Sequence, residues 1–360
     1  MKTVTVCASK TYDIHIGADL LPKLGFYART VSSGNHVCIV SDSKVWPLYG
    51  QTATAALESS GFTVHSFVFP QGEASKNGAT LLELLNDLAL AGLTRSDLII
   101  ALGGGVVGDL TGFAAAVYLR GISYIQVPTT VLAAVDSSVG GKTAIDLPAG
   151  KNLAGAFYQP SLVICDTNTM ATLPEEIFRD GCAEVIKYAV LYDPGLFAKL
   201  EQMILGFSLE DVISRCVIHK ARVVIQDEFD TGERMKLNLG HTIGHAFESL
   251  ALAEGRPVLH GYAVAWGLVC ELYLSYIKIG FPKELMRTVI QFIKENYGTF
   301  SFTCKQYDQL YELMTHDKKN SNGIINFTLL KGVGDICLNQ TADKDTLFEV
   351  FDFFRECMGE

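Results

Sequence analysis

Short runs of β-branched and aliphatic residues alternate with helical patterns between residues 37 and 166. We expect strands at 37–40, 62–69, 97–102, 124–127 and 162–165. Strands that alternate with helices are typical of βα units, which build a mostly parallel sheet covered by helices on both faces. The pattern therefore predicts an α/β domain, which we place at residues 1–172.

After Pro174 the pattern changes to long amphipathic stretches. Helices are expected at 175–191, 209–226, 237–253, 261–278, 283–297 and 306–315. A strand pair is expected at 324–330 and 335–338, around two glycines. Because apolar residues in these stretches recur every three to four positions, residues 173–360 are predicted to form a helical domain.

Composition excludes several classes of partner. The 360 residues carry a net charge of -10 without a basic block, which argues against nucleic acid and anionic membranes as partners. Two oily segments, 98–119 and 262–279, are interrupted by charged residues such as Asp109 and Glu271, so we expect buried core rather than membrane spans. Nine scattered cysteines without a CxxC pair, and no signal-peptide pattern, predict free thiols and a cytoplasmic location.

A glycine-rich loop follows the buried strand expected at 97–102. Residues 103–109 read GGGVVGD and satisfy GxGxxG between a strand and a helix, where backbone amides can approach a pyrophosphate. No acidic residue closes a second strand about twenty residues later, as the usual dinucleotide fingerprint requires, so a tight turn alone also explains the glycines. Three nearby segments, 128–130, 136–142 and 150–152, add hydroxyls and lysines and favour an anion site.

A polar stripe is predicted along the helix at 237–253. Its members are spaced by four, three, four and three residues: Arg234, Asn238, His241, His245 and Glu248. An apolar stripe with similar spacing lies beside it: Leu239, Ile243, Ala246 and Leu250. Solvated helix faces favour Lys and Glu, whereas this stripe has Asn and His beside Gly240 and Gly244, which let another backbone come close. The stripe therefore predicts a functional cleft.

Several of these residues are candidate metal ligands. His241 and His245 are four residues apart, as in helical metal sites that use two histidines. His260, which precedes Gly261, and Glu184, which shares a helix face with Lys187, are further candidates. Two histidines and one carboxylate would leave an open position and form a catalytic site. Spacing alone leaves open which histidines bind.

Together these motifs resemble the 3-dehydroquinate synthases. The matching segments follow in the expected order over nearly the whole chain: 103–110, 128–130, 135–143, 150–152, 183–187, 237–246 and 260–261. The resemblance implies a Rossmann-like NAD-binding domain, a helical domain that binds metal and substrate, an active site in the cleft between them, and a homodimer. Two departures are Glu175-Glu176, where the family commonly has a Pro-x-Arg-Glu run, and Lys44 after Asp42.

The resemblance also implies roles for individual residues. The metal, Zn²⁺ or Co²⁺, would be held by Glu184, His241 and His260. The substrate phosphate would be bound by Lys142, Asn152, Arg234, His245 and Lys318, with Arg120 reaching in from the partner subunit. The substrate ring and carboxylate would contact Asp136, Lys151, Lys187, Lys220 and Asn238. NAD would contact Asp42, Glu73, Lys76, Gly104, Gly105, Val106, Asp109, Thr129, Thr130 and Thr172, with Lys142 and Lys151 also close.

The implied reaction converts 3-deoxy-D-arabino-heptulosonate 7-phosphate, a small sugar phosphate, to 3-dehydroquinate and phosphate. It would proceed by transient oxidation with NAD, phosphate elimination, re-reduction and internal aldol closure, as a step of the shikimate pathway. Three alternatives remain: a sister sugar-phosphate cyclase, a polyol dehydrogenase with the same NAD and metal arrangement, and a non-enzymatic protein that senses NAD or phosphate.

Overall fold

The computed structural model describes residues 1–204, 209–315 and 324–359. The chain forms two units. Unit 1 contains residues 1–174 together with helix α7 (Leu209–Gln226) and the residues after it up to Phe229. Unit 2 contains α5 (Glu175–Leu191), α6 (Pro194–Ile204) and the chain from Asp230 onward. The first segment of unit 1 thus ends at Pro174, two residues after the expected boundary at 172/173. Unit 1 also contains α7, which packs on the first strands of unit 1 and not with the helical domain.

Unit 1 is built on a seven-stranded sheet. Its strands are β1 (Lys2–Cys7), β2 (Thr11–Gly17), β3 (His36–Asp42), β4 (Thr63–Phe69), β5 (Leu98–Gly103), β6 (Ser123–Pro128) and β9 (Leu162–Asp166). They lie in the order β1-β2-β9-β6-β5-β3-β4, and every pair except β1–β2 is parallel. The mostly parallel sheet is therefore confirmed, with each expected strand within two residues of its observed bounds; β1 and β2 were not expected.

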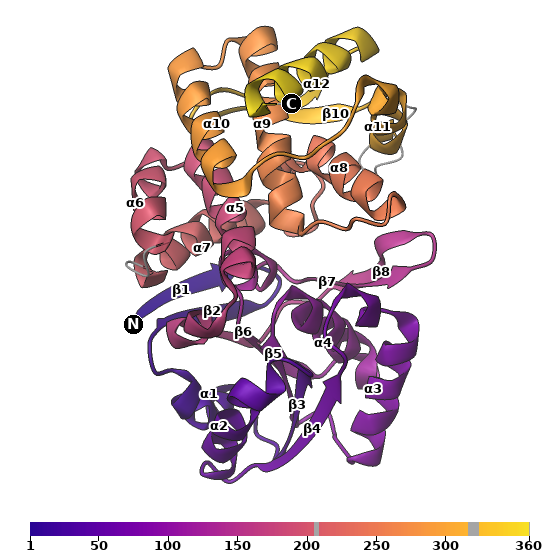
Figure 1. The fold of residues 1–360 in the computed structure, drawn as a ribbon. Coiled ribbons are helices and arrows are strands. Elements are labelled where there is room, and N and C mark those ends of the chain that lie inside the picture. The colour runs from indigo at the N-terminus through magenta and orange to yellow at the C-terminus, as the bar shows by residue number, and fades with distance from the viewer. Residues whose placement is uncertain (205–208, 316–323, 360) are drawn as a thin grey trace. The chain divides into compact units, whose positions relative to one another are not determined.

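Helices cover both faces of this sheet (Figure 1). Helices α1 (Leu24–Val31) and α2 (Trp46–Glu58) pack on one face, and α3 (Gly78–Leu90) and α4 (Gly105–Val117) pack on the other. Side chains alternate along β3: Val37 and Ile39 enter the first core, whereas Cys38 and Val40 enter the second. Central strand β5 is buried on both faces, which explains its unbroken apolar sequence.

The strand order creates a switch point next to β5. From β3 the chain passes to β4 at the sheet edge and then returns to the other side of β3 to form β5. In such doubly wound sheets the connections leave adjacent strands in opposite directions, so a crevice forms outside their carboxyl ends. The glycine loop follows the carboxyl end of β5 and therefore lies at this crevice. Strands β7 (Lys142–Leu147) and β8 (Gly150–Phe157) form a separate antiparallel hairpin.

Unit 2 is mostly helical. Besides α5 and α6 it contains α8 (His241–Ala253), α9 (His260–Ile279), α10 (Lys283–Tyr297), α11 (Tyr307–Thr315) and α12 (Lys344–Met358). The expected hairpin is present as β10 (Asn326–Gly332) and β11 (Asp335–Thr341). Helix α9 contacts α5, α8, α10, α12 and β10, so it is the core around which this unit packs. The helical prediction is confirmed, although α6 and α12 were not expected.

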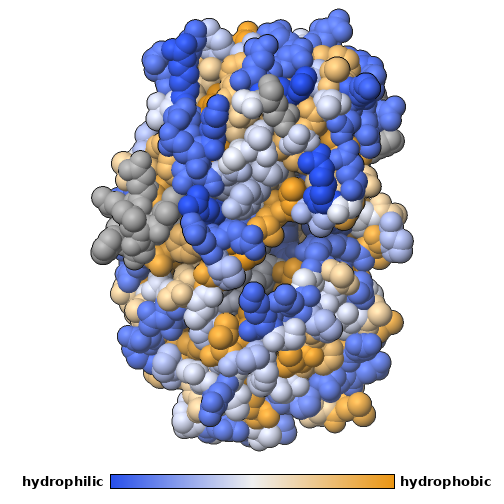
Figure 2. Space-filling model, in the orientation of Figure 1, coloured by the Kyte–Doolittle hydropathy of each residue, from blue (hydrophilic) through white to orange (hydrophobic). Residues whose placement is uncertain are grey.

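Among the described residues, none of the helices is both long and apolar enough to cross a membrane. Figure 2 shows hydrophilic residues spread over the face in view, with smaller hydrophobic patches between them. The oily segment at 262–279 corresponds to α9, whose residues are largely buried within unit 2. Its apolar character therefore reflects core packing, as predicted.

Candidate functional site

The polar stripe does not lie on one continuous helix. Arg234 and Asn238 belong to a short 3₁₀ helix, η6 (Glu233–Asn238), and α8 begins only at His241. Gly240 separates the two with a left-handed backbone, φ 80°, a conformation that glycine adopts without a Cβ clash. The prediction of a single five-residue face is therefore wrong for Arg234 and Asn238, because the helical spacing was extended across this break.

A buried carboxylate holds the start of α8. Glu271 of α9 is fully buried, and its two carboxylate oxygens accept hydrogen bonds from the N–H groups of Gly240, at 2.6 Å, and Ile243, at 3.1 Å. These N–H groups lie at the positive end of the helix, where a negative charge is stabilising. Glu271 therefore links α8 to α9 next to His241.

A second carboxylate holds the start of α9 in the same way. Asp180 of α5 is buried and accepts a 2.6 Å hydrogen bond from the N–H group of Gly261. Burial raises the pKa of Asp180 to about 6, although His260 and this hydrogen bond oppose the shift. A Cβ at Gly261 would lie 1.8 Å from the Asp180 carbonyl oxygen, so only glycine permits this approach. His260 thereby starts its helix directly beside α5.

Helices α8 and α9 also approach closely through glycine. A Cβ at Gly267 of α9 would lie 2.0 Å from the carbonyl oxygen of Gly240. A Cβ at Gly244 would lie 2.9 Å from the carbonyl oxygen of Ala263. The expectation that Gly240 and Gly244 admit another backbone is confirmed. Three helices are thus brought together at the points where Glu184, His241 and His260 lie.

These three side chains form a cluster inside unit 2. Glu184 comes from α5, while His241 and His260 are the first residues of α8 and α9. Their candidate ligand atoms all lie within 4.8 Å of one another. The Oε1 atom of Glu184 is 3.4 Å from His241 Nε2 and 3.8 Å from His260 Nε2. Two imidazole nitrogens and one carboxylate are donors that Zn²⁺ and Co²⁺ accept, so the residues fit such an ion.

The other ring nitrogen of each histidine is also engaged. His241 Nδ1 is 3.1 Å from the Leu239 carbonyl oxygen, and His260 Nδ1 is 3.3 Å from a carboxylate oxygen of Glu248. If each Nδ1 carries a proton and donates it to these acceptors, the Nε2 lone pair is left to bind an ion beside Glu184. Partners of this kind orient the histidines of metal sites and raise their basicity.

Charge in the cluster is balanced by a buried lysine. Lys187 lies one turn after Glu184 on α5, and the two fully buried side chains form an ion pair. Burial, together with the positive charge of Lys187, lowers the pKa of His241 to about 3, so this imidazole is neutral at physiological pH. Burial alone would lower the pKa of His260, but the hydrogen bond and charge of Glu248, with Glu184, raise it.

His245 lies beside the cluster, one turn along α8 from His241. Its ring centroid is 5.5 Å from that of His241 and 5.8 Å from that of His260. His245 does not belong to the group formed by Glu184, His241 and His260, whose candidate ligand atoms lie within 4.8 Å of one another. Arg234 is buried and Asn238 half-buried, both in η6 of the same unit.

The glycine loop of unit 1 has the geometry of a phosphate site. Gly104 precedes α4, so the first N–H groups of that helix have no partner within it. Thr129 follows β6 and donates its N–H to the Gly103 carbonyl at 3.0 Å. The buried hydroxyl of Thr129 has no hydrogen-bond partner among the described residues. A Cβ at Gly104 would lie 3.1 Å from the Thr130 side chain and crowd it, so glycine suits this position.

Further charged groups surround this loop. The buried ammonium of Lys76 is 2.6 Å from Glu73, 3.6 Å from Asp109 and 3.7 Å from Asp146. Burial raises the pKa of Asp109 to about 7, although Lys76 opposes the shift. Asp42, at the carboxyl end of β3, accepts the N–H groups of Lys44 and Val45.

Two predicted substrate residues meet within unit 1. Lys220 of α7 is buried and donates to a carboxylate oxygen and to the carbonyl oxygen of Asp136, each at 2.7 Å. Lys142 and Asn152, in contrast, lie at different levels of the β7–β8 hairpin. Lys142 pairs with Phe157 in the hairpin, and Asn152 lies five residues from Phe157, roughly 16 Å along the strand.

Three of the remaining predicted residues, Lys151, Arg120 and Thr172, belong to the described part of the chain. Lys151 is exposed on β8. Arg120 is exposed after α4, where it and Leu119 both have positive φ. Thr172 contacts the hydroxyl of Tyr49 at 2.5 Å. Lys318 lies outside the described residues.

Sequence reasoning missed the buried carboxylates that hold the histidines. Glu271 and Asp180 had no assigned role, and Glu248 was only a member of the polar stripe. The signal for Glu271 was available, since it is a charged residue inside an otherwise apolar segment. A fully buried glutamate in such a segment needs hydrogen-bond donors nearby.

Comparisons with known proteins agree with this geometry. Residues 66–180 match the model for the 3-dehydroquinate synthase N-terminal region, and residues 181–320 match the model for the C-terminal region. The 3-dehydroquinate synthase of Pelobacter propionicus is 46% identical over 96% of this chain and 98% of its own length. That of Parabacteroides distasonis is 44% identical over 81% of this chain and 84% of its own.

A solved structure adds a likeness of fold. The crystal structure of 2-deoxy-scyllo-inosose synthase complexed with carbaglucose-6-phosphate, NAD+ and Co2+ has a TM-score of 0.85 and 27% identity, and the match covers 99% of both chains. The parallel-sheet unit and the helical unit are thus shared with this synthase. On these grounds the chain belongs to the 3-dehydroquinate synthase family.

Proposed function

We propose that the protein converts 3-deoxy-D-arabino-heptulosonate 7-phosphate to 3-dehydroquinate and phosphate, as a step of the shikimate pathway. The observation that carries this proposal is the cluster of Glu184, His241 and His260 in a chain of this family. A carboxylate and two imidazoles with an open position suit catalysis on an alcohol better than they suit a closed structural site.

Glu184, His241 and His260 would hold Zn²⁺ or Co²⁺ through one oxygen and two Nε2 atoms. When bound, the ion would supply Lewis acidity that eases loss of the proton and hydride from a substrate alcohol. The Leu239 carbonyl and the Glu248 carboxylate would keep the two imidazoles oriented, so the ligands would not need to rearrange during the reaction. Lys187 would balance the charge of Glu184 and contact the substrate.

NAD would bind in unit 1, with its pyrophosphate on the N–H groups of Gly104, Gly105 and Val106 and on Thr129 and Thr130. Support comes from the free first turn of α4 and from the unpartnered, buried Thr129 hydroxyl. The cofactor would take a hydride from the substrate and return it later, so no net oxidation would occur. Asp42, Glu73, Lys76 and Thr172 would lie toward the adenosine end, with Lys142 and Lys151 also close, and Asp109 toward the nicotinamide.

Substrate contacts would come from both units. Lys142, Asn152, Arg234, His245 and Lys318 are proposed to bind the phosphate, and Asp136, Lys151, Lys187, Lys220 and Asn238 the ring and its carboxylate. The buried guanidinium of Arg234 suits a phosphate oxygen pair. The departing phosphate is itself basic enough to take the neighbouring proton, so the tasks of these residues are positioning and charge stabilisation.

We further propose a homodimer and a reducing cytosol. Arg120 is exposed and carries a positive φ, which suits a side chain that reaches into a partner subunit. Exposed Leu119 and Val117 precede it and are candidates for contact with that partner. The nine cysteines, all in the described part of the chain, are free, as a reducing compartment would require.

The test is phosphate release from the heptulosonate phosphate by metal-stripped protein to which NAD and single divalent metals are returned. We expect phosphate release that requires both additions, while the absorbance of reduced cofactor stays flat. Accumulating NADH would instead indicate a dehydrogenase. Turnover of a different sugar phosphate alone would indicate a sister cyclase, and NAD binding without any turnover would indicate a sensing protein.

A further inference from the structure

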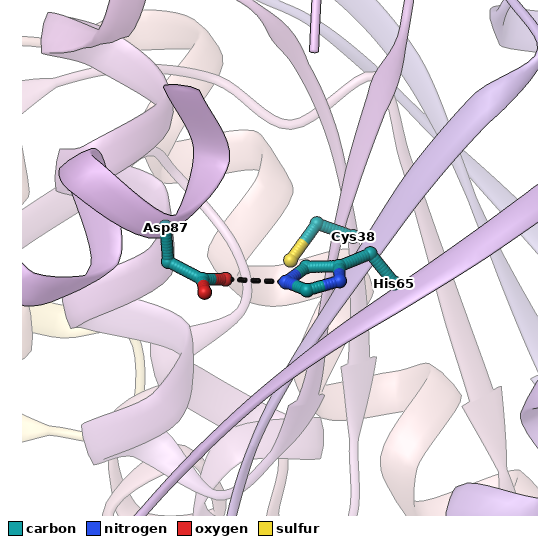
Figure 3. A group of neighbouring side chains, drawn as sticks. All are labelled: Cys38, His65 and Asp87. Carbon is teal, nitrogen blue, oxygen red and sulfur yellow. Dashed lines mark hydrogen bonds and ion pairs between the residues drawn. The ribbon is translucent and has the colours of Figure 1, made fainter. Parts of the chain in front are cut away.

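A second cluster of metal-ligating side chains lies in unit 1, on the sheet face covered by α3 and α4. Cys38 of β3 and His65 of β4 are direct partners in the parallel ladder, and Asp87 comes from α3. Figure 3 shows the Cys38 sulfur beside the His65 ring and the Asp87 carboxylate facing that ring. His65 Nε2 is 2.6 Å from Asp87 Oδ2, and one ligand atom from each residue lies within 4.8 Å of the other two.

We propose that Cys38, His65 and Asp87 bind a thiophilic divalent cation, with Zn²⁺ as the best fit. One sulfur, one nitrogen and one oxygen donor form a set typical of zinc and unlike the all-oxygen sites of Mg²⁺ or Ca²⁺. On binding, the thiol of Cys38 would release its proton to solvent, and the thiolate would form the bond to the ion. A water molecule would complete the fourth position.

The surroundings of the cluster suit an ion that enters from solvent. Cys38 is fully buried, and it belongs to the apolar core beneath α3, so the inner side of the site is closed. The side chains of His65 and Asp87 are 43% and 31% exposed, which leaves the outer side open. Two ligands about 2.1 Å from a tetrahedral ion lie about 3.4 Å apart. The His65–Asp87 pair would therefore open by about 0.8 Å, which two partly exposed side chains can do.

This site shares no residue with the proposed catalytic cluster, and within unit 1 it lies away from the glycine loop. Cys38 pairs with Ile99 near the amino end of β5, and Gly103 is four residues further along, about 13 Å away. An ion here would not touch the cofactor. It would instead tie β4, the strand at the sheet edge, and α3 to β3. The competing explanation is a His65–Asp87 ion pair beside an inert core thiol, which requires no metal.

The test uses absorption spectroscopy of the full-length, metal-stripped protein titrated with Cd²⁺ or Co²⁺. Thiolate coordination gives a charge-transfer band in the ultraviolet, whereas the cluster of Glu184, His241 and His260 has no sulfur donor and is silent there. Because the stripped protein offers two clusters, we expect the band to account for one of two bound equivalents of cation, and Zn²⁺ to abolish it. His65 and Asp87 are partly exposed, so the variants His65→Gln and Asp87→Asn should fold. Each variant should weaken cation binding at the Cys38 site at least tenfold.

Cys165→Ser is the matched control, because Cys165 is also a buried thiol in the same sheet but belongs to no such cluster among the described residues. This variant should keep the band, and Cys38→Ala should lose it. A wild-type protein that shows no thiolate band overturns the proposal. So does a band of equal strength and affinity in wild type, His65→Gln and Asp87→Asn, because the sulfur would then lie elsewhere.

Discussion

Replacing Glu271 with glutamine tests whether a buried carboxylate positions the histidines that we propose as metal ligands. Glu271 lies on α9 and accepts the N–H groups of Gly240 and Ile243, which flank His241. Glutamine has the same shape, but it keeps only one acceptor oxygen and turns its NH₂ group toward the other N–H. One charge-assisted hydrogen bond is therefore lost, and one buried donor is left without an acceptor. The start of α8, and His241 with it, should shift.

The expected cost follows from these two contacts. A hydrogen bond to a charged group contributes about 1.5–3 kcal/mol, and an unsatisfied buried donor costs about 1–3 kcal/mol. Allowing for partial relaxation, Glu271→Gln should lower the free energy of unfolding by about 3 kcal/mol. For a unit of this size that corresponds to a fall in melting temperature of about 6–12 °C. Altering a group that holds a metal ligand in place typically weakens metal affinity about 10- to 100-fold. Glu271 holds the backbone around His241, so we expect metal binding to weaken by about that factor.

The assay combines thermal unfolding of metal-stripped protein with Zn²⁺ affinity from competition with a chromophoric chelator. Glu284→Gln is the matched control, because the Glu284 side chain on α10 is 85% exposed and should change stability by less than about 0.5 kcal/mol. If Glu271→Gln melts with the control and retains wild-type Zn²⁺ affinity, the carboxylate does not anchor α8 and the reasoning is refuted. Lower stability with unchanged Zn²⁺ affinity would refute the link to His241 alone.

Three further variants test individual groups. His260→Ala should lose the metal and all turnover while NAD binding survives; normal metal content measured by elemental analysis would contradict its role as a ligand. His245→Ala should keep the metal and slow phosphate release, and metal loss would favour the two-histidine site on α8. Because burial raises the pKa of Asp109 to about 7, above its ordinary 3.8, this group stabilises the folded protein at low pH, and that contribution is lost as pH rises toward 7. Asparagine does not titrate, so the free energy of unfolding of Asp109→Asn, measured in urea, should fall less than that of the wild type between about pH 4 and 7. The difference between the two slopes should reach up to about 1.4 kcal/mol per pH unit. Parallel curves for the two proteins would contradict the raised pKa.

The parallel sheet could be predicted because its strands are buried on both faces. Strand β5 shows this best, since all six of its residues are buried and the sequence is a continuous apolar run before the glycines. Strands β1 and β2 lack that signal. In β1 only Val6 is buried, and β2 alternates buried with partly exposed residues such as His15. Strands that are partly exposed and carry polar residues have weaker local patterns than fully buried ones, so sequence reasoning passed over β1 and β2.

The unit to which α7 belongs could not be read from the sequence for a different reason. Its bounds were predicted at 209–226 and are observed at Leu209–Gln226, because the amphipathic pattern is local. Its packing partners are β1 and β2, which lie about 200 residues earlier in the chain. The ion pair between Lys2 and Asp211, at 2.6 Å, joins the same two regions. Periodicity shows that a face is apolar, but it does not name the surface that the face covers.

The candidate site separates local from long-range information in the same way. Four-residue spacing correctly placed His241 and His245 on one face of α8, and their rings are 5.5 Å apart. Spacing could not rank them as ligands, because the deciding partner is Glu184, from a helix more than fifty residues earlier.

What brings Glu184 to His241 and His260 is the close approach of three helices. That approach depends on glycines such as Gly261 and Gly267, where a single Cβ would collide with a neighbouring carbonyl. It depends equally on Asp180 and Glu271, buried carboxylates that hold the first turns of α9 and α8. A glycine or a buried acid has no periodic signature, so the sequence shows the candidate ligands but not the contacts that select among them. The proposed ligand set follows from helix packing, and a change at these contacts should therefore alter metal binding without replacing a proposed ligand.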